Sequence, residues 1–351
     1  MVAHVSLRNF RSYPELDLPL SGGVVLVTGP NGVGKTNLLE AVHVGAQGFS
    51  PRTRAEPRLV RFGESAARVK LAGAEHGTPF ETEVDVNPPT AKRIRLNGAV
   101  LSSGDELRLR LAALAFTPDR LAVVKGGPLV RRTYLDRMLG RLFPARAELP
   151  PSYARALAQR NAALRRVRVG ESSREVVGPW TEQVATLGDE LDRARAELVD
   201  LLRPRFAEHG EALGLADPTL GYEDEGLTVE ALAARLERDI ERGTTGVGPH
   251  LKDAAIASAG RDLRAFGSQG EQRTAVLALV LAEADLLLER RGEPPLLLLD
   301  DVFSELDRAR AQALVSRLPA GGQTLVTATD RPEVLQPDLV VAVKLGEARV
   351  A

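Results

Sequence analysis

Apolar and polar residues alternate along much of the first hundred residues, as they do in strands with one buried face. Partial alternation covers these segments: Val5–Leu7, Leu16–Leu18, Ala66–Ala72, Glu81–Val86 and Ile94–Leu96. A continuous apolar and β-branched run, Val24–Thr28, predicts a fully buried strand, and a helical pattern begins at Asn37. The N-terminal part of the chain is therefore expected to be mainly strands around one helix.

Helical spacing replaces the alternation from about Ser103, where Ser103–Glu106 is typical of a helix start. Segments rich in Ala, Leu, Arg and Glu cover Pro128–Gly140, Pro151–Arg168 and Val176–Ala207. These segments predict a helical insert. Its longest helices are long enough for an antiparallel hairpin, but they lack the heptads of an extended coiled coil.

Strand signals return at Ala254–Ala257 and then alternate with helical patterns to the end of the chain. The predicted elements are a helix at Gly270–Arg290, a strand at Pro295–Asp300, a helix at Asp307–Leu318, and strands at Thr324–Thr329 and Leu339–Lys344. This order is typical of an α/β core with a parallel or mixed sheet. We expect a core made of residues 1–102 and 243–351 and a mainly helical insert at 103–242.

A phosphate-binding motif stands between the first buried strand and the helix that follows it. The residues Gly29-Pro30-Asn31-Gly32-Val33-Gly34-Lys35-Thr36 fit G-x-x-x-x-G-K-[ST], and Asn37, which follows them, is a further candidate for nucleotide binding. Backbone N–H groups of such a loop point at phosphate oxygens at a helix N-terminus. Lys35 is expected to reach the β- and γ-phosphates, and the Thr36 hydroxyl to bind Mg²⁺. The motif predicts that the chain binds a nucleoside triphosphate.

A second part of a nucleotide site follows the apolar run Leu296–Leu299, which ends in Asp300 and Asp301. A buried strand that delivers an acid to its carboxyl end is the Walker B arrangement. We expect Asp300 to hold Mg²⁺ through water and Asp301 to polarise the attacking water. A buried strand with a solvated acidic turn is the alternative, and the P-loop in the same chain disfavours it.

The segment Ser268-Gln269-Gly270-Glu271-Gln272 stands just before a predicted long helix. Ser268 and Glu271 have the spacing of a capping box, so a well-capped helix would explain the segment on its own. The free N–H groups of the helix start and the serine hydroxyl also suit an anion. Another polar turn, Phe303–Asp307, follows Asp301 and enters the next predicted helix.

The chain has 351 residues, a formal net charge of −1 and no cysteine, which excludes disulfides, thiolate metal sites and cysteine nucleophiles. The N-terminus lacks the charged and apolar regions of a signal peptide, and no apolar stretch approaches the ~18 residues of a membrane span. We expect a cytoplasmic protein.

Local clusters of arginine stand out against the near-neutral total and suit DNA phosphates without base-specific readout. The candidate contacts are Arg52, Arg54, Arg131, Arg132, Arg165 and Arg166. Solvated helix faces are the alternative for any single arginine.

The order of these motifs resembles the ABC-type ATPases, and more narrowly the branch that contains SMC, Rad50 and RecF. The opening segment Leu7–Tyr13 matches this branch, and the short helical insert is similar to that of the RecF-like family. Further matching segments are Gly34–Ala41, Phe116–Asp119, Gly127-Pro128 with Arg131-Arg132 and Leu135-Asp136, and Thr245–His250. The resemblance implies the fold of an ABC-type ATPase head, with a mixed β-sheet P-loop core built from both ends of the chain and a helical lobe.

Members of this family are similar to other ABC-type ATPases in enclosing ATP between two chains. The resemblance implies that Ser268 and Gly270 contact the γ-phosphate held by a second copy, with Gln272 in the same nucleotide site. Ser304 and Asp307 would line the same interface. The ATP-bound homodimer would bind duplex DNA and single-strand/duplex junctions, act with RecO and RecR, and help to load RecA.

The chain departs from the wider ABC pattern where most members have Glu after the Walker B Asp. Asp301 is one methylene shorter, which moves the carboxylate by about 1.5 Å and predicts slow hydrolysis. Ala328-Thr329-Asp330 stands where many members have a switch histidine, and Thr329 is a candidate replacement. Two other classes stay open, an ABC-type motor subunit of a transporter and a small-molecule P-loop kinase.

Overall fold

The structure, a computed structural model, describes residues 1–351 except for the side chains of Asp105, Leu109 and Asp119. The chain forms two compact units. Unit 1 contains Met1–Leu121, Glu208–Leu215 and Arg273–Ala351, and unit 2 contains Ala122–Ala207 and Ala216–Gln272. No helix in the described part of the chain is long and apolar enough to span a bilayer.

The first sheet of unit 1 is antiparallel, with the strand order β2-β1-β4-β5-β6-β7. Its strands are β1 (Val2–Phe10), β2 (Tyr13–Pro19), β4 (Ala67–Glu75), β5 (Thr78–Val86), β6 (Arg93–Leu96) and β7 (Ala99–Val100). In β1, Val5 and Leu7 are buried and alternate with more exposed neighbours, because one face of the sheet covers the core.

The second sheet of unit 1 is mixed, with the order β15-β14-β3-β13-β12-β8. All neighbours are parallel except β15, which pairs antiparallel with β14. The strands are β3 (Gly23–Thr28), β8 (Ala113–Phe116), β12 (Leu296–Leu299), β13 (Gln323–Ala328), β14 (Leu339–Lys344) and β15 (Glu347–Val350). This sheet confirms the predicted core of parallel strands from both ends of the chain.

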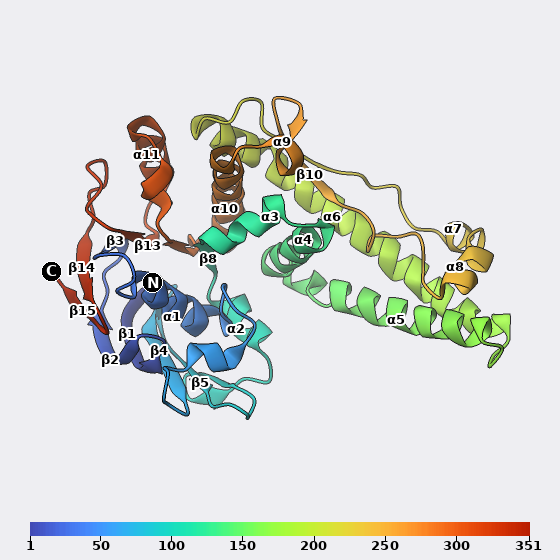
Figure 1. Ribbon diagram of the computed structural model, residues 1–351, viewed down its shortest axis with the longest axis horizontal. Coiled ribbons are helices and arrows are strands. Elements are labelled where there is room, and N and C mark those ends of the chain that lie inside the picture. The colour runs from blue at the N-terminus through green and yellow to red at the C-terminus, as the bar shows by residue number, and fades with distance from the viewer. The chain divides into compact units, whose positions relative to one another are not determined.

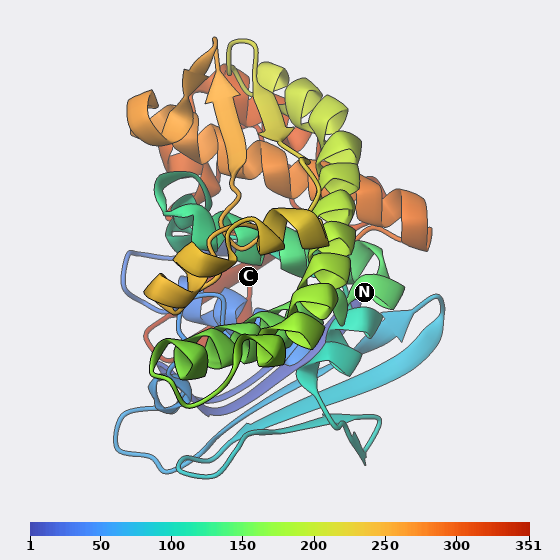
Figure 2. The same ribbon diagram turned by 90° about the vertical axis from the view of Figure 1, so that its right-hand side faces the viewer.

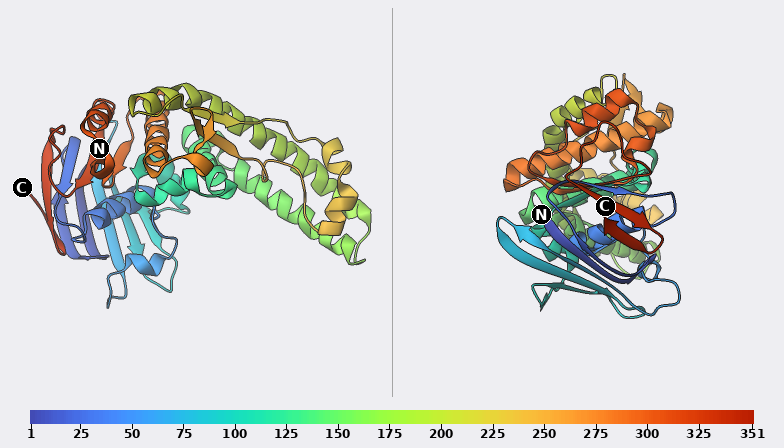
Figure 3. Two further views of the ribbon diagram at one scale, coloured as in Figure 1. Left: turned by 45° about the horizontal axis from the view of Figure 1, so that its top comes forward. Right: turned by 90° about the vertical axis from the view of Figure 1, so that its left-hand side faces the viewer.

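Helix α1 (Lys35–Gln47) packs against strands of both sheets, namely β4 and β5 of the first and β8 and β13 of the second (Figure 1). Gly45 allows the close approach, since a Cβ there would lie 2.5 Å from Cγ of Leu71. β15 of the second sheet lies beside β2 of the first (Figure 3, right). One hydrophobic core therefore joins both sheets and the P-loop helix.

The remaining elements of unit 1 are short, apart from the part of α10 that belongs to this unit. They are η1 (Glu56–Leu59), α2 (Gly104–Arg110), η2 (Pro118–Leu121), η5 (Val302–Glu305) and α11 (Arg308–Val315). Ser103 caps α2 through a capping box with Glu106, as its sequence predicts.

Unit 2 is mainly helical and contains a small antiparallel sheet of order β11-β10-β9. Its elements are α3 (Ala122–Lys125), α4 (Pro128–Leu142), η3 (Pro144–Arg146), α5 (Leu149–Arg168), η4 (Arg174–Val177), α6 (Gly178–Ala212), β9 (Thr219–Tyr222), α7 (Val229–Ala233), α8 (Leu236–Arg242), β10 (Ala254–Ser258), β11 (Arg261–Asp262), α9 (Leu263–Phe266) and α10 (Gln269–Arg291), although α6 and α10 end in unit 1. α5 and α6 form the predicted antiparallel hairpin (Figures 1 and 2). The fully buried Arg160 of α5 donates hydrogen bonds to Thr181, Asp239 and Thr245, which fixes α5 against α6 and α8.

The division into units differs from the boundaries expected from the sequence. The first boundary lies after Leu121 rather than after residue 102, because β8 joins the second sheet through β12. Residues 243–272 belong to unit 2, since β10 pairs with β9 and Asp253 forms an ion pair with Arg131. The segment Ser268–Gln272 therefore lies in unit 2 and not in the ATPase core.

Candidate nucleotide-binding site

The P-loop Gly29–Thr36 runs from the end of β3 into the first turn of α1, as its sequence predicts. Gly29 has φ of +150°, and a Cβ there would lie 2.4 Å from the carbonyl oxygen of Val343. Gly34 has φ of +117°, and a Cβ there would lie 2.6 Å from Oγ of Ser12. The loop conformation therefore requires glycine at both positions, for backbone and for steric reasons.

Lys35 is 8% exposed and points back over the loop. Its ammonium group donates hydrogen bonds of 2.7 Å to the carbonyl of Gly29 and 2.9 Å to the carbonyl of Pro30. Beside the loop, the Thr329 hydroxyl lies 3.4 Å from Oδ1 of Asn31. The ammonium group of Lys35 and the polar side chains of Asn31 and Thr329 therefore all lie at the phosphate-binding loop.

The P-loop and the Walker B strand meet through a direct hydrogen bond. The hydroxyl of Thr36 donates to Oδ1 of Asp300 at 2.9 Å, and the buried hydroxyl of Thr327 on β13 donates to the same oxygen at 2.7 Å. Burial raises the pKa of Asp300, and the hydrogen bonds from Thr327 and Thr36 oppose this shift. A carboxylate held in such a dry site is stabilised by a cation.

A cavity of about 10 Å³ adjoins this pair, with Thr36, Asp300, Arg52 and Thr117 among its lining residues. Thr117 follows β8 and is 5% exposed, and its hydroxyl has no hydrogen-bond partner among the described residues. Such a volume is about the least that can hold one ordered water molecule.

Asp301 starts the turn after β12 in the left-handed region, with φ of 50° and ψ of 39°. Its backbone N–H donates to the Thr327 hydroxyl at 2.8 Å. Among non-glycine residues, Asp and Asn tolerate this conformation best, which gives a backbone reason for the short acid at this position.

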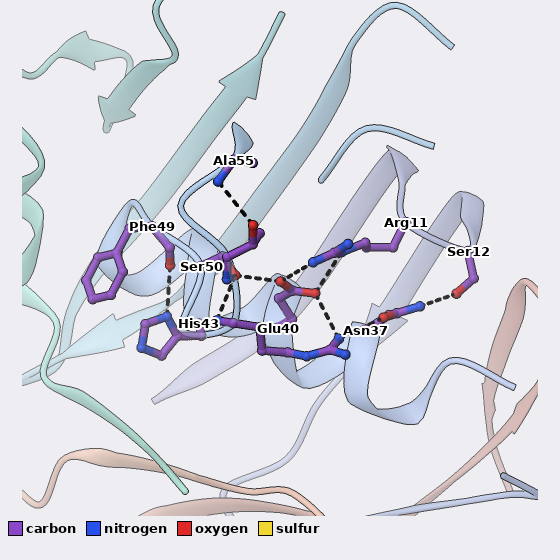
Figure 4. Close-up of polar contacts among 10 residues, drawn as sticks. Arg11, Ser12, Asn37, Glu40, His43, Phe49, Ser50 and Ala55 are labelled. Atoms are coloured by element: carbon purple, nitrogen blue, oxygen red, sulfur yellow. Dashed lines mark hydrogen bonds and ion pairs between the residues drawn. The ribbon is translucent and has the colours of Figure 1, made fainter. Parts of the chain in front are cut away.

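A buried carboxylate, Glu40 of α1, connects the P-loop helix to two neighbouring loops (Figure 4). It accepts two hydrogen bonds from Arg11, of 2.8 and 2.7 Å, and one of 2.5 Å from Ser50. Asn37 donates to Ser12 at 3.0 Å. The turn between β1 and β2 and the loop after α1 are therefore both fixed to the helix that begins with Lys35.

The segment before α10 forms the predicted capping box. Oγ of Ser268 accepts from the N–H of Glu271 at 3.2 Å, and the N–H of Ser268 donates to Oε2 of Glu271 at 2.8 Å. Ser268 and Gly270 are exposed, and a Cβ at Gly270 would have no atom within 4 Å. Gln272 instead is 5% exposed and donates from Nε2 to the carbonyl of Leu263 at 2.7 Å.

Comparison with known proteins agrees with the resemblance drawn from the motifs. Residues 1–350 match the family described as RecF/RecN/SMC N terminal domain. The chain is 38% identical over 347 residues to the DNA replication and repair protein RecF of Symbiobacterium thermophilum, covering 94% of this chain and 92% of that protein. It is 37% identical over 358 residues to RecF of Frankia alni, covering 95% and 94% of the two chains. The chain belongs to the RecF family.

Solved structures agree with this family and with the predicted ABC-type ATPase fold. The structure of the recombination mediator protein RecF-ATP in the RecFOR pathway has a TM-score of 0.89 and 27% identity, over 100% of this chain and 97% of that one. An SMC head has a TM-score of 0.60 at 17% identity, over 100% of this chain and 97% of that one, which shows the shared fold alone.

The structure of this RecF family member separates the arginines predicted to contact DNA. Arg131 is 4% exposed and forms an ion pair with Asp253, while its Nη1 donates to carbonyls of the α3 region. The prediction of a DNA contact is therefore wrong for Arg131, because its guanidinium is buried and bonded within unit 2. Arg132 is half-buried, and its Nη1 donates to the carbonyl of Lys252 at 2.8 Å.

Arg52 lies beside the P-loop helix, with Nη1 at 3.3 Å from both Oδ1 of Asn37 and Oε2 of Glu40. It is therefore placed at the nucleotide site rather than in a separate basic patch. Arg54, Arg165 and Arg166 are exposed.

Some residues of the site have no recognisable motif in the sequence. Thr327 and Glu40 are the clearest cases, and their only signal in the sequence is a polar residue inside an otherwise apolar run.

His250 of the Thr245–His250 segment makes hydrogen bonds inside unit 2. Its Nδ1 lies 2.7 Å from the Tyr153 hydroxyl and its Nε2 lies 3.0 Å from the Thr245 carbonyl, and burial lowers its pKa.

Proposed function

We propose that this chain binds ATP and Mg²⁺ at the P-loop and that two copies enclose the nucleotide between the P-loop of one and the Ser268–Gly270 segment of the other. The observation that carries the proposal is the 2.9 Å hydrogen bond from Thr36 to Asp300, because it brings the P-loop hydroxyl and the Walker B acid to one point. The RecF-ATP structure supports the same nucleotide for this chain.

The residues around Asp300 fit a Mg²⁺ ion. The Thr36 hydroxyl is an oxygen ligand that this ion accepts, the Asp300 carboxylate can hold the ion through water, and the buried Thr117 hydroxyl offers a partner for one of its waters. The described residues contain no group of three His, Cys, Asp or Glu that could hold a metal. This suits Mg²⁺, which in nucleotide sites is bound by one or two protein groups, phosphates and water. Bound there, the ion would neutralise charge on the phosphate oxygens.

Asp301 is the group proposed to orient and deprotonate the water that attacks the γ-phosphorus. Lys35 would leave the Gly29 and Pro30 carbonyls and bind the β- and γ-phosphates, which are stronger acceptors for an ammonium group. We expect hydrolysis to be slow, below about 1 s⁻¹ per site without DNA, because the short Asp301 side chain places its carboxylate farther from the phosphate than a glutamate would.

The exposed segment at the start of α10 supports the proposed homodimer. Ser268 can still donate from its hydroxyl, since its capping bond uses the oxygen as acceptor. Gly270 has open space around it, so a second chain can approach its backbone closely. Gln272 is assigned to positioning the segment through Leu263 rather than to direct contact with ATP.

ATP-bound dimers are proposed to bind DNA through backbone phosphates, at duplex regions and single-strand/duplex junctions, and to release it after hydrolysis. The exposed Arg54, Arg165 and Arg166 are the candidate contacts. RecO and RecR are the proposed partners, with RecA loading as the outcome, because the similar structures belong to the RecFOR pathway. Family membership disfavours the two other classes, a transporter motor and a small-molecule kinase.

The oligomeric state with and without ATP tests the proposal. The wild-type chain should be monomeric without nucleotide and dimeric with ATP and Mg²⁺. Lys35→Met should lose ATP binding and dimerisation together, whereas Ser268→Arg should keep ATP binding and lose only the dimer. A monomer that hydrolyses ATP at the full rate would contradict the shared site.

A further inference from the structure

Arg273 of α10 contacts three residues of unit 1 next to the Walker B strand, although no motif assigns it a role. Its Nη2 donates a 2.6 Å hydrogen bond to the backbone carbonyl of Asp301, and its Nη1 donates a 2.8 Å bond to Oε1 of Glu305. The guanidinium also lies 5.5 Å from the ring centroid of Phe116, at the end of β8. The residue is only 8% exposed.

The backbone of Asp301 needs this support because it is held in the left-handed region, which costs free energy for a residue with a side chain. Its N–H is fixed by Thr327, while its carbonyl accepts from Arg273 and, at 3.0 Å, from the Ser304 hydroxyl. Once both ends of the residue are fixed, the direction of its Cα–Cβ bond is fixed as well. The aspartate carboxylate, with few rotatable bonds, then has a narrow range of positions.

We propose that Arg273 is a positioning residue for the reaction, which holds Asp301 where its carboxylate can meet the attacking water. This inference rests on the proposed function, because it takes Asp301 as the group that acts on water. Arg273 does not touch the nucleotide in this assignment, so its loss lowers the rate of hydrolysis and leaves ATP affinity and dimerisation unchanged.

The planar guanidinium is required for this arrangement. Two of its nitrogens bind two different oxygens while its central carbon lies over an aromatic ring, and a lysine ammonium cannot do all three at once. We therefore expect Arg273→Lys to restore only part of the rate lost in Arg273→Met. The Met variant should still fold, since the Asp301 carbonyl keeps the Ser304 bond and Glu305 is 44% exposed in its side chain.

The test is single-turnover ATP hydrolysis by the full chain in a double-mutant cycle of Arg273→Met and Asp301→Asn. A misplacement of about 1 Å costs up to ~100-fold in rate, so Arg273→Met should be about 10- to 100-fold slower than wild type. If Arg273 acts through Asp301, adding Arg273→Met to Asp301→Asn should cost less than twofold more. Rates that multiply, or an Arg273→Met rate within twofold of wild type, would overturn the proposal.

A matched control is Arg317→Met, which removes another partly buried arginine of unit 1, one that contacts Glu208 and His209 outside the nucleotide site. It should hydrolyse ATP within twofold of wild type.

ATP affinity and ATP-dependent dimerisation should stay within about twofold of wild type in every Arg273 variant, and a loss of either that accompanies the loss of rate would also overturn the proposal. If Arg273→Met fails to fold, the same cycle is made with Arg273→Lys. An unchanged rate in Asp301→Asn alone would contradict the proposed function rather than the role of Arg273.

Discussion

Arg11 and Glu40 form a two-bond ion pair in which the glutamate side chain is completely buried. Nε donates to Oε2 at 2.8 Å and Nη2 donates to Oε1 at 2.7 Å. Glu40 lies on α1, so the pair fixes the turn between β1 and β2 to the P-loop helix (Figure 4). The neighbouring Tyr13 hydroxyl donates to the carbonyl of Gly34 at 3.0 Å, which links the same turn to the P-loop itself.

Removing the cation of this pair should destabilise the chain. In Arg11→Met the carboxylate of Glu40 stays buried and keeps Arg52, at 3.3 Å, and Ser50 as partners, so the loss should be about 1.5–3 kcal/mol, the range for hydrogen bonds to a charged group. Urea denaturation should show this loss in the free energy of unfolding. The control Arg349→Met removes an exposed pair with Glu347 and should cost less than about 0.5 kcal/mol. Equal losses in the free energy of unfolding for the two substitutions would mean that the buried pair stabilises the chain no more than an exposed pair does.

A large side chain at Gly270 should block dimerisation without harming the monomer. A Cβ at Gly270 would have open space among the described residues, and leucine is the better helix former, so the melting temperature of Gly270→Leu should match or exceed that of wild type. ATP-dependent dimerisation should fall by more than about tenfold, because the side chain would occupy space proposed for the second copy. Gly178→Leu on α6 is the control, since a Cβ at Gly178 would also have open space among the described residues. Dimerisation that persists in Gly270→Leu would exclude the segment from the interface.

The raised pKa of Asp300 gives a test that depends on pH. Because the folded-state pKa lies above the ordinary value of 3.8, the folded chain binds this proton more tightly than the unfolded chain. The stability gained from the proton is therefore present at low pH and is lost as pH rises through the raised pKa. Asp300→Asn removes the buried charge, and its Oδ1 still accepts from Thr36 and Thr327.

Without Mg²⁺ or nucleotide, Asp300→Asn should therefore melt at a higher temperature than wild type at about pH 7.5. The difference should shrink as the pH falls toward about 4. Adding MgATP should stabilise wild type and have a weaker effect on the variant, since the carboxylate proposed to hold Mg²⁺ is lost. A lower melting temperature for the variant at neutral pH would show that the carboxylate is not penalised by burial.

The sequence allowed the prediction of those parts of the site that lie in short, continuous motifs. The P-loop at Gly29–Thr36 and the strand before Asp300 could be predicted because strand, loop and helix follow one another directly. The same reasoning gave the α5–α6 hairpin. The position of the unit boundaries was not predictable in this way, because it depends on β8 joining β12, a pairing between distant parts of the chain.

The supporting residues could not be predicted because their partners lie far away in the sequence. Thr327 contacts Asp300 and Asp301 only because β13 and β12 are parallel neighbours in this register. Arg131 and Arg165 have equivalent arginine-rich contexts, yet one is buried in an ion pair and the other is exposed. Charge clusters in a sequence do not distinguish these cases, since burial is decided by packing between elements.

The exposed pair Arg165 and Arg166 at the end of α5 provides the test of DNA binding. The double variant Arg165→Glu/Arg166→Glu should weaken binding of the ATP-bound protein to gapped duplex by about tenfold or more. It should also reduce the slope of log K against log salt by about 1.8, since each lost phosphate contact changes the slope by ~0.9. A control with the same charge change, Arg331→Glu/Arg349→Glu on exposed residues of unit 1, should leave the slope unchanged. If both double variants lower the affinity for DNA equally and change the slope of log K against log salt by the same amount, net charge and not these two arginines determines DNA binding.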